Sequence, residues 1–335
     1  MPNPLHLIAP GVRVLSEPET PRPEWLELRK GGLGGSDALA IANLDQYRSP
    51  LRVWLEKTGE DLNEEGDNPL LHWGRMMEAP LADWFAETSG IEIFECGMLG
   101  HPSIDWMRFS PDRLTADDAI LEIKTVGPYA VAAAWENGKT PDRAVVQVHH
   151  GMHVTGKQRA YVVGGVWGAE PQLRVIERDE SIIEELVKLE TEFWQYVIDL
   201  TPPPLGQHPD EAALLRLLYP LGDPDLAVEL SPRAFAALSA YQKLGEQAKT
   251  LDAQRLAMQA IVTAELGEAT EGTWQGKPVV SWRNNAPLSE KTLRTEHPDL
   301  ATEYTIQKDA LDRDRLYRDH PELTARLRAR RFLVN

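Results

Sequence analysis

The chain has 335 residues, a formal net charge of −17, and a composition of 42% hydrophobic and 26% charged residues, which is typical of a soluble globular protein of about two domains. Its single cysteine, Cys96, excludes an internal disulfide, a cysteine zinc site and a cysteine-ligated iron–sulfur cluster, and favours a reducing cytoplasm. No stretch approaches the ~20 apolar residues of a membrane span, and the negative charge counts against nucleic-acid binding unless a local basic groove lies within an acidic surface.

Apolar periodicity and turn residues predict an α/β arrangement over residues 1–204. The predicted elements are helices at 24–30, 38–42, from 50 onward and 70–88, strands at 91–98, 107–110 and 120–124, a helical region at 129–153 interrupted at 138–141, strands at 160–166 and 173–177, and a helix at 181–200. Helices, an antiparallel meander, a helix and a strand in this order indicate a central sheet flanked by helices.

Three consecutive prolines at 202–204 predict a boundary between a core, residues 1–204, and an extension, residues 205–335. The extension reads as mostly helical, with one long helix and a small hairpin at 273–282 that turns at Gln275-Gly276.

The long helix of the extension, residues 231–266, has apolar residues at alternating steps of three and four, interrupted at Arg255. The seam consists of Ala237, Tyr241, Leu244, Ala248, Leu251, Met258 and Val262. Such a seam packs within the chain, pairs with another subunit or docks a partner, and the sequence leaves all three open. The tail after it holds seven arginines that form either a solvated helix face or a basic patch for duplex DNA: Arg313, Arg315, Arg318, Arg326, Arg328, Arg330 and Arg331.

The residues most suggestive of chemistry are Asp112 and the predicted strand that follows it. Asp112 comes before a turn-rich segment, and alternation along the strand places Glu122 and Lys124 on one face and Leu121 and Ile123 on the other. Two acids across a hairpin with a neighbouring lysine are typical of a nuclease site that holds a divalent metal and a water against a phosphate. In isolation, a surface Asp and an exposed Glu–Lys face is the commoner explanation for the same letters.

Magnesium suits this set because it prefers hard oxygen ligands and keeps several waters. We expect Asp112, Glu122 and the backbone carbonyl of Ile123 to be its ligands, with Glu78 on the preceding helix as a further candidate. Lys124 would orient or help to deprotonate the attacking water.

The amino-terminal glycine run, residues 31–35, suits close approach of the backbone to a phosphate. Ser36 at a helix start offers a hydroxyl, and Arg29 and Arg52 would add charge-assisted bonds to a terminal 5′-phosphate. The alternative is that Ser36 is only an N-cap after a flexible loop.

Seven segments occur in one order over roughly residues 24–200: Trp25–Arg29, Gly34–Asp37, Trp73–Glu78, Ser110–Asp112, Glu122–Lys124, Gln147 and Ile176–Glu180. In this arrangement the chain resembles the YqaJ-like viral recombinase family, which includes the lambda-type phage exonucleases of the PD-(D/E)XK nuclease fold. The resemblance implies an α/β restriction-endonuclease-like core with a central mixed sheet. It also implies a Mg²⁺-dependent 5′-to-3′ exonuclease, with Mn²⁺ as a substitute, that resects linear double-stranded DNA ends for homologous recombination by single-strand annealing.

By the same resemblance, Glu78, Asp112, Glu122 and Lys124 take catalytic roles, with Gln147 on the supporting helix. Related enzymes are trimeric rings around DNA and work with an annealing protein, which implies a homo-oligomer in the cytoplasm of a bacterial host or a phage-infected cell. One departure is a tyrosine of lambda-type enzymes that is replaced here by Ala144, and His149 or His150 is a candidate to compensate for it.

Other interpretations remain open at this point. A structure-specific or nicking endonuclease on the same fold is the main alternative, and a catalytically weak DNA-end-binding scaffold is another. His149, His150 and His153 crowd one helix and could bind zinc, but no acidic partner has the right helical spacing, so DNA-facing or packing roles are favoured.

Overall fold

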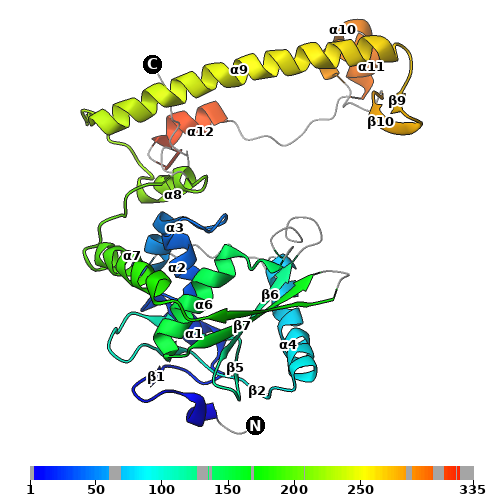
Figure 1. Ribbon diagram of the computed structural model, residues 1–335. Coiled ribbons are helices and arrows are strands. Elements are labelled where there is room, and N and C mark those ends of the chain that lie inside the picture. Colours follow the sequence, from blue (N-terminus) through cyan, green and yellow to red (C-terminus); the bar gives the residue numbers. More distant parts are fainter. Residues whose placement is uncertain are drawn as a thin grey trace. The chain divides into compact units, whose positions relative to one another are not determined.

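The computed structural model describes residues 4–59, 69–126, 135, 138–166, 170–206, 208–283, 289–304, 313–321 and 323–324. The chain divides into two compact units, Met1–Tyr219 and Pro220–Asn335 (Figure 1). No helix in the described ranges combines the length and apolar character that crossing a membrane requires.

The centre of the first unit is a five-stranded sheet in the order β2-β5-β6-β7-β8. Its strands are β2 (Ile93–Phe94), β5 (Arg113–Thr115), β6 (Ile120–Val126), β7 (Arg159–Val166) and β8 (Gln172–Glu177). β6 and β7 pair in parallel and the other neighbours pair antiparallel, so the sheet is mixed as predicted. A smaller sheet joins β1 (Arg13–Val14), β3 (Leu99–Gly100) and β4 (Arg108–Phe109).

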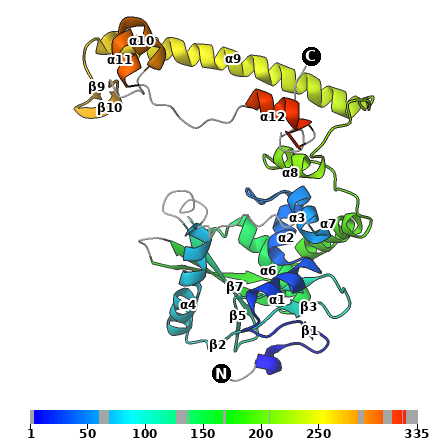
Figure 2. The same cartoon turned by 180° about the vertical axis from the view of Figure 1, so that it is seen from behind.

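The helices of the first unit cover both faces of the central sheet. They are η1 (Pro4–Leu7), α1 (Arg22–Lys30), α2 (Gly35–Ile41), α3 (Pro50–Thr58), α4 (Pro69–Ser89), α6 (Asp142–Thr155), α7 (Glu180–Ile198) and α8 (Glu211–Leu218). α4 packs on one face of β6 and β7 and α6 packs on the other (Figures 1 and 2).

The alternation along β6 decides which side chains meet which helix. Leu121 and Ile123 are buried with Leu81 and Phe85 of α4. Ile120 faces the opposite way, into a core that contains buried apolar residues of α6. Because successive side chains of a strand point to opposite faces, Glu122 and Lys124 share the α6 face, as the sequence predicted.

Local signals explain several helix limits. The Ser49 side chain accepts the Arg52 backbone N–H at 3.2 Å and Pro50 follows, which starts α3, while Gly59 ends it in the left-handed region. Gly156 ends α6 in the same way, with φ 75°. The glycine run after α1 joins the small sheet, since Leu33 donates to the Trp106 carbonyl at 2.7 Å and accepts from the Arg108 N–H at 2.9 Å. A Cβ at Gly32 would lie 2.3 Å from the Trp106 oxygen, so this approach requires glycine.

The second unit contains α9 (Pro232–Leu266), the hairpin β9 (Glu271–Trp274) and β10 (Lys277–Ser281), α10 (Glu290–Glu296), α11 (Pro298–Glu303) and α12 (Arg313–Asp319). α9 runs without a break through Arg255, and none of its residues is buried. The seam residues Tyr241, Leu244 and Leu251 are about 60% exposed, so packing within the chain does not cover them among the described residues. Three of the tail arginines are exposed on α12, and Arg326, Arg328, Arg330 and Arg331 lie outside the described residues.

One predicted strand differs from the structure, one predicted helical region lies partly outside the described residues, and the first unit ends later than the predicted boundary. The strand expected at 91–98 is reduced to β2, because pairing with β5 covers only Ile93 and Phe94. Part of the helical region expected at 129–153 lies outside the described residues. The first unit extends to Tyr219 rather than ending at the prolines, because Leu214 of α8 is buried in the same cluster as Leu51 of α3.

Candidate active site

Asp112 and Glu122 lie on the two sides of the β5–β6 hairpin. Asp112 immediately precedes β5, rather than lying within it, and its Oδ2 accepts the backbone N–H of Ile123 at 2.6 Å. Glu122, in the middle of β6, is 1% exposed. The register that pairs Arg113 with Leu121 therefore holds both acids against the same stretch of β6.

Glu122 belongs to a closed hydrogen-bond network with Lys124 and Gln147. The Lys124 ammonium donates to Glu122 Oε1 and, at 2.7 Å, to Gln147 Oε1. Gln147 Nε2 donates to Glu122 Oε1 at 2.6 Å. Glu122 Oε2 is buried and has no hydrogen-bond partner among the residues that the structure describes, so one carboxylate oxygen of this network is open to a cation.

Glu78 reaches the site from α4 and is held by an arginine that the sequence did not single out. Arg113 Nη1 donates to Glu78 Oε1 at 3.2 Å and also to the backbone carbonyl of Asp112, and its Nη2 lies 3.5 Å from Glu95 Oε1. Arg113 follows Asp112 directly in the chain, so this contact couples the α4 acid to the start of β5.

The three acids create a strongly negative, partly dehydrated environment. Burial raises the pKa of the Asp112 carboxyl well above its usual range, and the charges of Glu122 and Glu78 add to the increase. The Lys124 ammonium and the Ile123 N–H act in the opposite direction without reversing it. Within the described ranges no three acidic, histidine or cysteine side chains are gathered closely enough to enclose a metal ion. Arg113 and Lys124 form ion pairs with Glu78 and Glu122.

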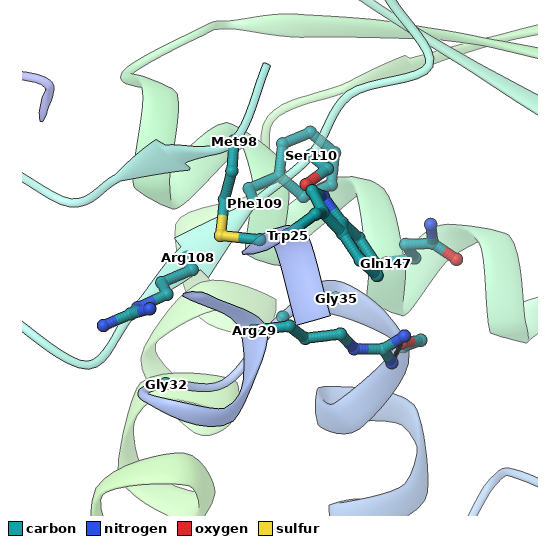
Figure 3. A pocket seen from close by; sticks show the side chains of 11 residues that line it. Trp25, Arg29, Gly32, Gly35, Met98, Arg108, Phe109, Ser110 and Gln147 are labelled. Carbon is teal, nitrogen blue, oxygen red and sulfur yellow. Dashed lines mark hydrogen bonds between the residues drawn. The ribbon is translucent and has the colours of Figure 1, made fainter. Parts of the chain in front are cut away.

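A cavity of about 120 Å³ adjoins this network. Figure 3 shows residues around it, which come from α1, the glycine run, the start of α2, the residue before β3, β4 with the residue after it, and α6. Its lining consists of Trp25, Arg29, Gly32, Gly34, Gly35, Ser36, Met98, Arg108, Phe109, Ser110 and Gln147. Gln147 thus belongs both to the cavity and to the network around Glu122, which joins the two parts of the site.

Arg29 and Ser36, the two residues expected at a terminal phosphate, both line the cavity and contact each other. Arg29 Nη2 donates to Ser36 Oγ at 2.8 Å and lies 3.4 Å from Asp37 Oδ1. The Arg29 guanidinium also lies 5.5 Å from the centre of the Trp25 ring. The structure therefore brings together a hydroxyl and a half-buried guanidinium beside the glycine run.

Comparisons with known proteins agree with this geometry. The sequence pattern of the YqaJ-like viral recombinase domain matches residues 24–158, which contain every site residue described above. The chain is 30% identical over 292 residues to the Bacillus subtilis (strain 168) protein described as "Uncharacterized protein YqaJ", and the match covers 84% of this chain and 90% of that protein. The chain belongs to the YqaJ-like viral recombinase family.

Two solved structures are similar to this YqaJ-like chain at lower identity. One is an alkaline exonuclease, LHK-Exo, from Laribacter hongkongensis, with 20% identity, a TM-score of 0.46, and coverage of 58% of this chain and 96% of that one. The other is a phage-related exonuclease from Haemophilus somnus 129PT, with 12% identity, a TM-score of 0.38, and coverage of 50% and 94%. The predicted α/β core with a central mixed sheet flanked by helices is confirmed.

Arg52 lies elsewhere in this YqaJ-like chain. Its Nε donates to Asp210 Oδ2 at 3.1 Å, which ties α3 to the start of α8, and it does not line the cavity. The cation that sequence reasoning missed there is Arg108, on β4. The sequence offered only a weak signal for it: Arg108 lies two residues before the Ser-Pro-Asp motif, separated from it by Phe109.

The histidines of α6 have packing roles. His150 is fully buried, with Nδ1 2.9 Å from Glu190 Oε1 of α7 and Nε2 2.8 Å from the Arg108 carbonyl. His149 Nδ1 lies 2.7 Å from the Val145 carbonyl, and the His153 ring stacks on His101 at 4.6 Å. Neither His149 nor His150 is bonded to the acids of the site in the described part of the chain.

Proposed function

We propose that this YqaJ-like protein is a metal-dependent deoxyribonuclease, an exonuclease that degrades one strand of linear duplex DNA from its 5′ end. The observation that supports this most is the link through Gln147, whose amide bonds Glu122 and Lys124 while its side chain lines the cavity of Arg29 and Ser36. A chemical site and an anion pocket one side chain apart suit an enzyme that acts at the end of a strand. The membership in a viral recombinase family supports DNA as the substrate.

The acids fit a divalent cation. Glu122 Oε2 is buried without a partner, and negative charge concentrates at Asp112, which is what a bound cation would relieve. Asp112, Glu122, the Ile123 carbonyl and Glu78 are the groups that would hold Mg²⁺, or Mn²⁺ in its place. When bound, the ion would neutralise charge on the phosphate and lower the pKa of a water.

The chain's own residues would do the rest. Lys124 uses two of its three N–H donors on Glu122 and Gln147, so the third can reach a phosphate oxygen or the attacking water. Gln147 holds the ammonium and the Glu122 carboxylate in fixed relation, which preorganises the charge. Asp112 is fixed by the Ile123 N–H and cannot swing away from β6.

At the other end of the site, Arg29 and Ser36 would hold the terminal 5′-phosphate through charge-assisted bonds. A phosphate held in the cavity would place the next phosphodiester toward the Gln147 side of the site. This arrangement would confine cleavage to ends and favour mononucleotide release.

The family resemblance of the sequence motifs supports a role in DNA recombination. We propose that the enzyme resects DNA ends for recombination by single-strand annealing, together with an annealing protein, in the cytoplasm of a bacterial host or a phage-infected cell. We also propose a homo-oligomer, a trimeric ring in related enzymes, in which the first unit carries the chemistry.

The test is one gel assay with three substrates: linear duplex with 5′-phosphate ends, linear duplex with 5′-hydroxyl ends, and closed circular duplex. We expect Mg²⁺-dependent loss of the phosphorylated linear duplex with mononucleotide release, slower loss of the hydroxyl form, and intact circles, all abolished by EDTA. Nicking or linearisation of circles would instead identify an endonuclease. DNA-end binding without cleavage in Mg²⁺ or Mn²⁺ would identify a scaffold.

A further inference from the structure

Asp37, next to Ser36, is a buried carboxylate that the proposed chemistry does not use. It is 0% exposed and lies on α2, directly behind the cavity wall. Its two oxygens accept from four donors. Oδ1 is 2.9 Å from Arg48 Nη2 and 3.4 Å from Arg29 Nη2, and Oδ2 is 2.8 Å from Lys57 Nζ and 3.1 Å from the Gly34 N–H.

The three cations come from three separate parts of the chain. Arg29 ends α1, Arg48 lies in the loop after α2, and Lys57 lies on α3. Arg48 has a second acidic partner, Glu56, at 2.5 Å, whereas Asp37 is the only acid among the described residues that Arg29 and Lys57 contact. Burial of a carboxylate is costly unless charged and polar donors compensate for the lost water. The three cations and the Gly34 N–H provide this compensation, and they fix the position of Asp37.

Lys57 and Asp37 together hold Arg29 at both ends. The Lys57 ammonium is 2% exposed and donates to the Arg29 backbone carbonyl at 2.9 Å as well as to Asp37. Asp37 in turn receives the Arg29 guanidinium through Nη2, the same nitrogen that donates to Ser36.

These contacts fix the Nη2 edge of the Arg29 guanidinium and leave its other N–H donors available to a ligand. Nη1 and Nε of Arg29 donate no hydrogen bond to any described residue, and the side chain is 33% exposed. An arginine has four rotatable side-chain bonds and loses much rotamer freedom when it is fixed. Holding it in place before the ligand arrives therefore lowers the cost of binding.

We infer that Asp37 is a positioning residue for 5′-end recognition: braced by Lys57 and Arg48, it fixes the Arg29 guanidinium so that its free donors meet a terminal phosphate. This inference rests on the proposed function. It adds a residue that touches neither the DNA nor the reacting atoms and acts through Arg29.

The test measures the ratio of affinities for 5′-phosphorylated and 5′-hydroxyl duplex by fluorescence anisotropy, in the full-length protein, with Ca²⁺ in place of Mg²⁺. Asp37→Asn keeps the shape but removes the charge. We expect the phosphate-to-hydroxyl ratio to fall roughly tenfold, as for the misalignment of one charge-assisted hydrogen bond, with hydroxyl-end affinity unchanged. Lys57→Met, which keeps the buried aliphatic stem, should shift the ratio in the same direction.

Two controls make the result specific. Glu56→Gln removes an acid that contacts Arg48 alone, and the ratio should not change. In an Arg29→Ala background, Asp37→Asn should have no further effect on the ratio, because a residue that acts through Arg29 has nothing left to position.

Equal loss of affinity for both ends in Asp37→Asn, or a full effect in the Arg29→Ala background, would overturn the inference. If Asp37→Asn does not fold, an unchanged ratio in a folded Lys57→Met overturns it. If the wild-type protein prefers the 5′-phosphorylated duplex and both variants have the same affinity ratio, only this inference is overturned and the proposed function stands. A wild-type ratio near one removes the end-recognition part of the proposed function and the inference with it.

Discussion

At the scale of single residues, the acids of the candidate site differ in their hydrogen-bond and ion-pair partners. Glu122 has one oxygen saturated by Lys124 and Gln147 and the other buried without a partner, whereas Glu78 is engaged by Arg113. A buried carboxylate oxygen without a hydrogen-bond partner lowers the stability of the ligand-free protein. Such an oxygen therefore fits a ligand-binding role better than a structural one.

Glu122→Gln should therefore abolish cleavage while the fold and DNA binding persist. The amide keeps the size and one acceptor but loses the charge, and removing a metal-dependent stabilisation worth several kcal/mol lowers single-turnover cleavage by about 10³-fold or more. Anisotropy in Ca²⁺ should give unchanged affinity for linear duplex. Glu184→Gln, at an exposed position on α7, is the matched control and should cleave normally. Near-normal cleavage by Glu122→Gln would refute the site.

The buried His150–Glu190 pair predicts a pH dependence of stability. Burial alone would lower the pKa of the His150 imidazole, but the adjacent Glu190 carboxylate and the Arg108 carbonyl raise it above its usual 6.5. The stability that the charged pair contributes is fully present below pH 6.5 and is lost as the pH rises through the raised value. The pKa of His153 is lowered to about 4, mainly by burial, so its effect has the opposite sign: it destabilises the fold as the pH falls below the unfolded value of 6.5, and it has no effect well above that pH.

Urea unfolding at a series of pH values from 7 upward, where the histidines with lowered pKa values no longer titrate in either state, checks this. The wild-type free energy of unfolding should decline by about 1.4 kcal/mol for each pH unit across which the group titrates. Glu190→Gln and His150→Gln should both flatten the decline, whatever their absolute stability. Parallel declines in wild type and variants would assign the effect to other groups.

At the scale of elements, the contact between α2 and α6 joins the two parts of the site. Gly35, at the start of α2, lies against Gln147 of α6, and an added Cβ would lie 2.7 Å from Gln147 Cγ and 3.1 Å from its backbone oxygen. Any side chain there must push the helices apart, because the backbone oxygen cannot move independently of α6.

Gly35→Ala should destabilise the first unit by about 1–3 kcal/mol and lower cleavage by displacing Gln147. Gly245→Ala is the control: nothing lies within 4 Å of its added Cβ on the exposed α9, so it should stabilise that helix by ~0.5–1 kcal/mol without affecting cleavage. Denaturant unfolding followed by circular dichroism measures both. A stable, active Gly35→Ala would contradict close packing of the two helices.

At the scale of the whole molecule, the proposed chemistry lies entirely in the unit that ends at Tyr219. The second unit holds a 35-residue helix with no buried residue, so its apolar side chains contribute little to any core among the described residues. A chain ending at Tyr219 should thus unfold with a free energy within about 1 kcal/mol of that for unfolding the first unit in the full chain. This corresponds to a difference in Tm of roughly 2–4 °C.

The same truncation should retain single-turnover cleavage at saturating DNA, while multiple-turnover processivity is free to change. Calorimetry and rapid-quench kinetics provide the two measurements. A truncated chain that does not unfold cooperatively, or that folds but does not cleave, would mean that the second unit is part of the catalytic domain.

Sequence alone determined what is encoded locally. The alternation of Leu121, Glu122, Ile123 and Lys124 specified the two faces of β6, because a strand has a period of two whatever it packs against. Ser49-Pro50, the glycines at helix ends and the apolar spacing located most helices, because caps and helical periodicity also depend only on neighbouring residues. The order of motifs predicted the family and the mixed-sheet fold.

Only the tertiary structure decided which distant residues share an environment. It gathered Arg29, Arg48 and Lys57 on Asp37, brought Arg113 to Glu78, and moved Arg52 away to Asp210, although Arg52 and Lys57 lie on the same short helix. Charged side chains choose partners by proximity after the core has formed, and the core is built by apolar packing that the charged positions do not specify. The sequence therefore determined most of the secondary structure and the candidate acids, while packing of α1, α2, α3 and α6 decided how these acids lie relative to the cavity of Arg29 and Ser36.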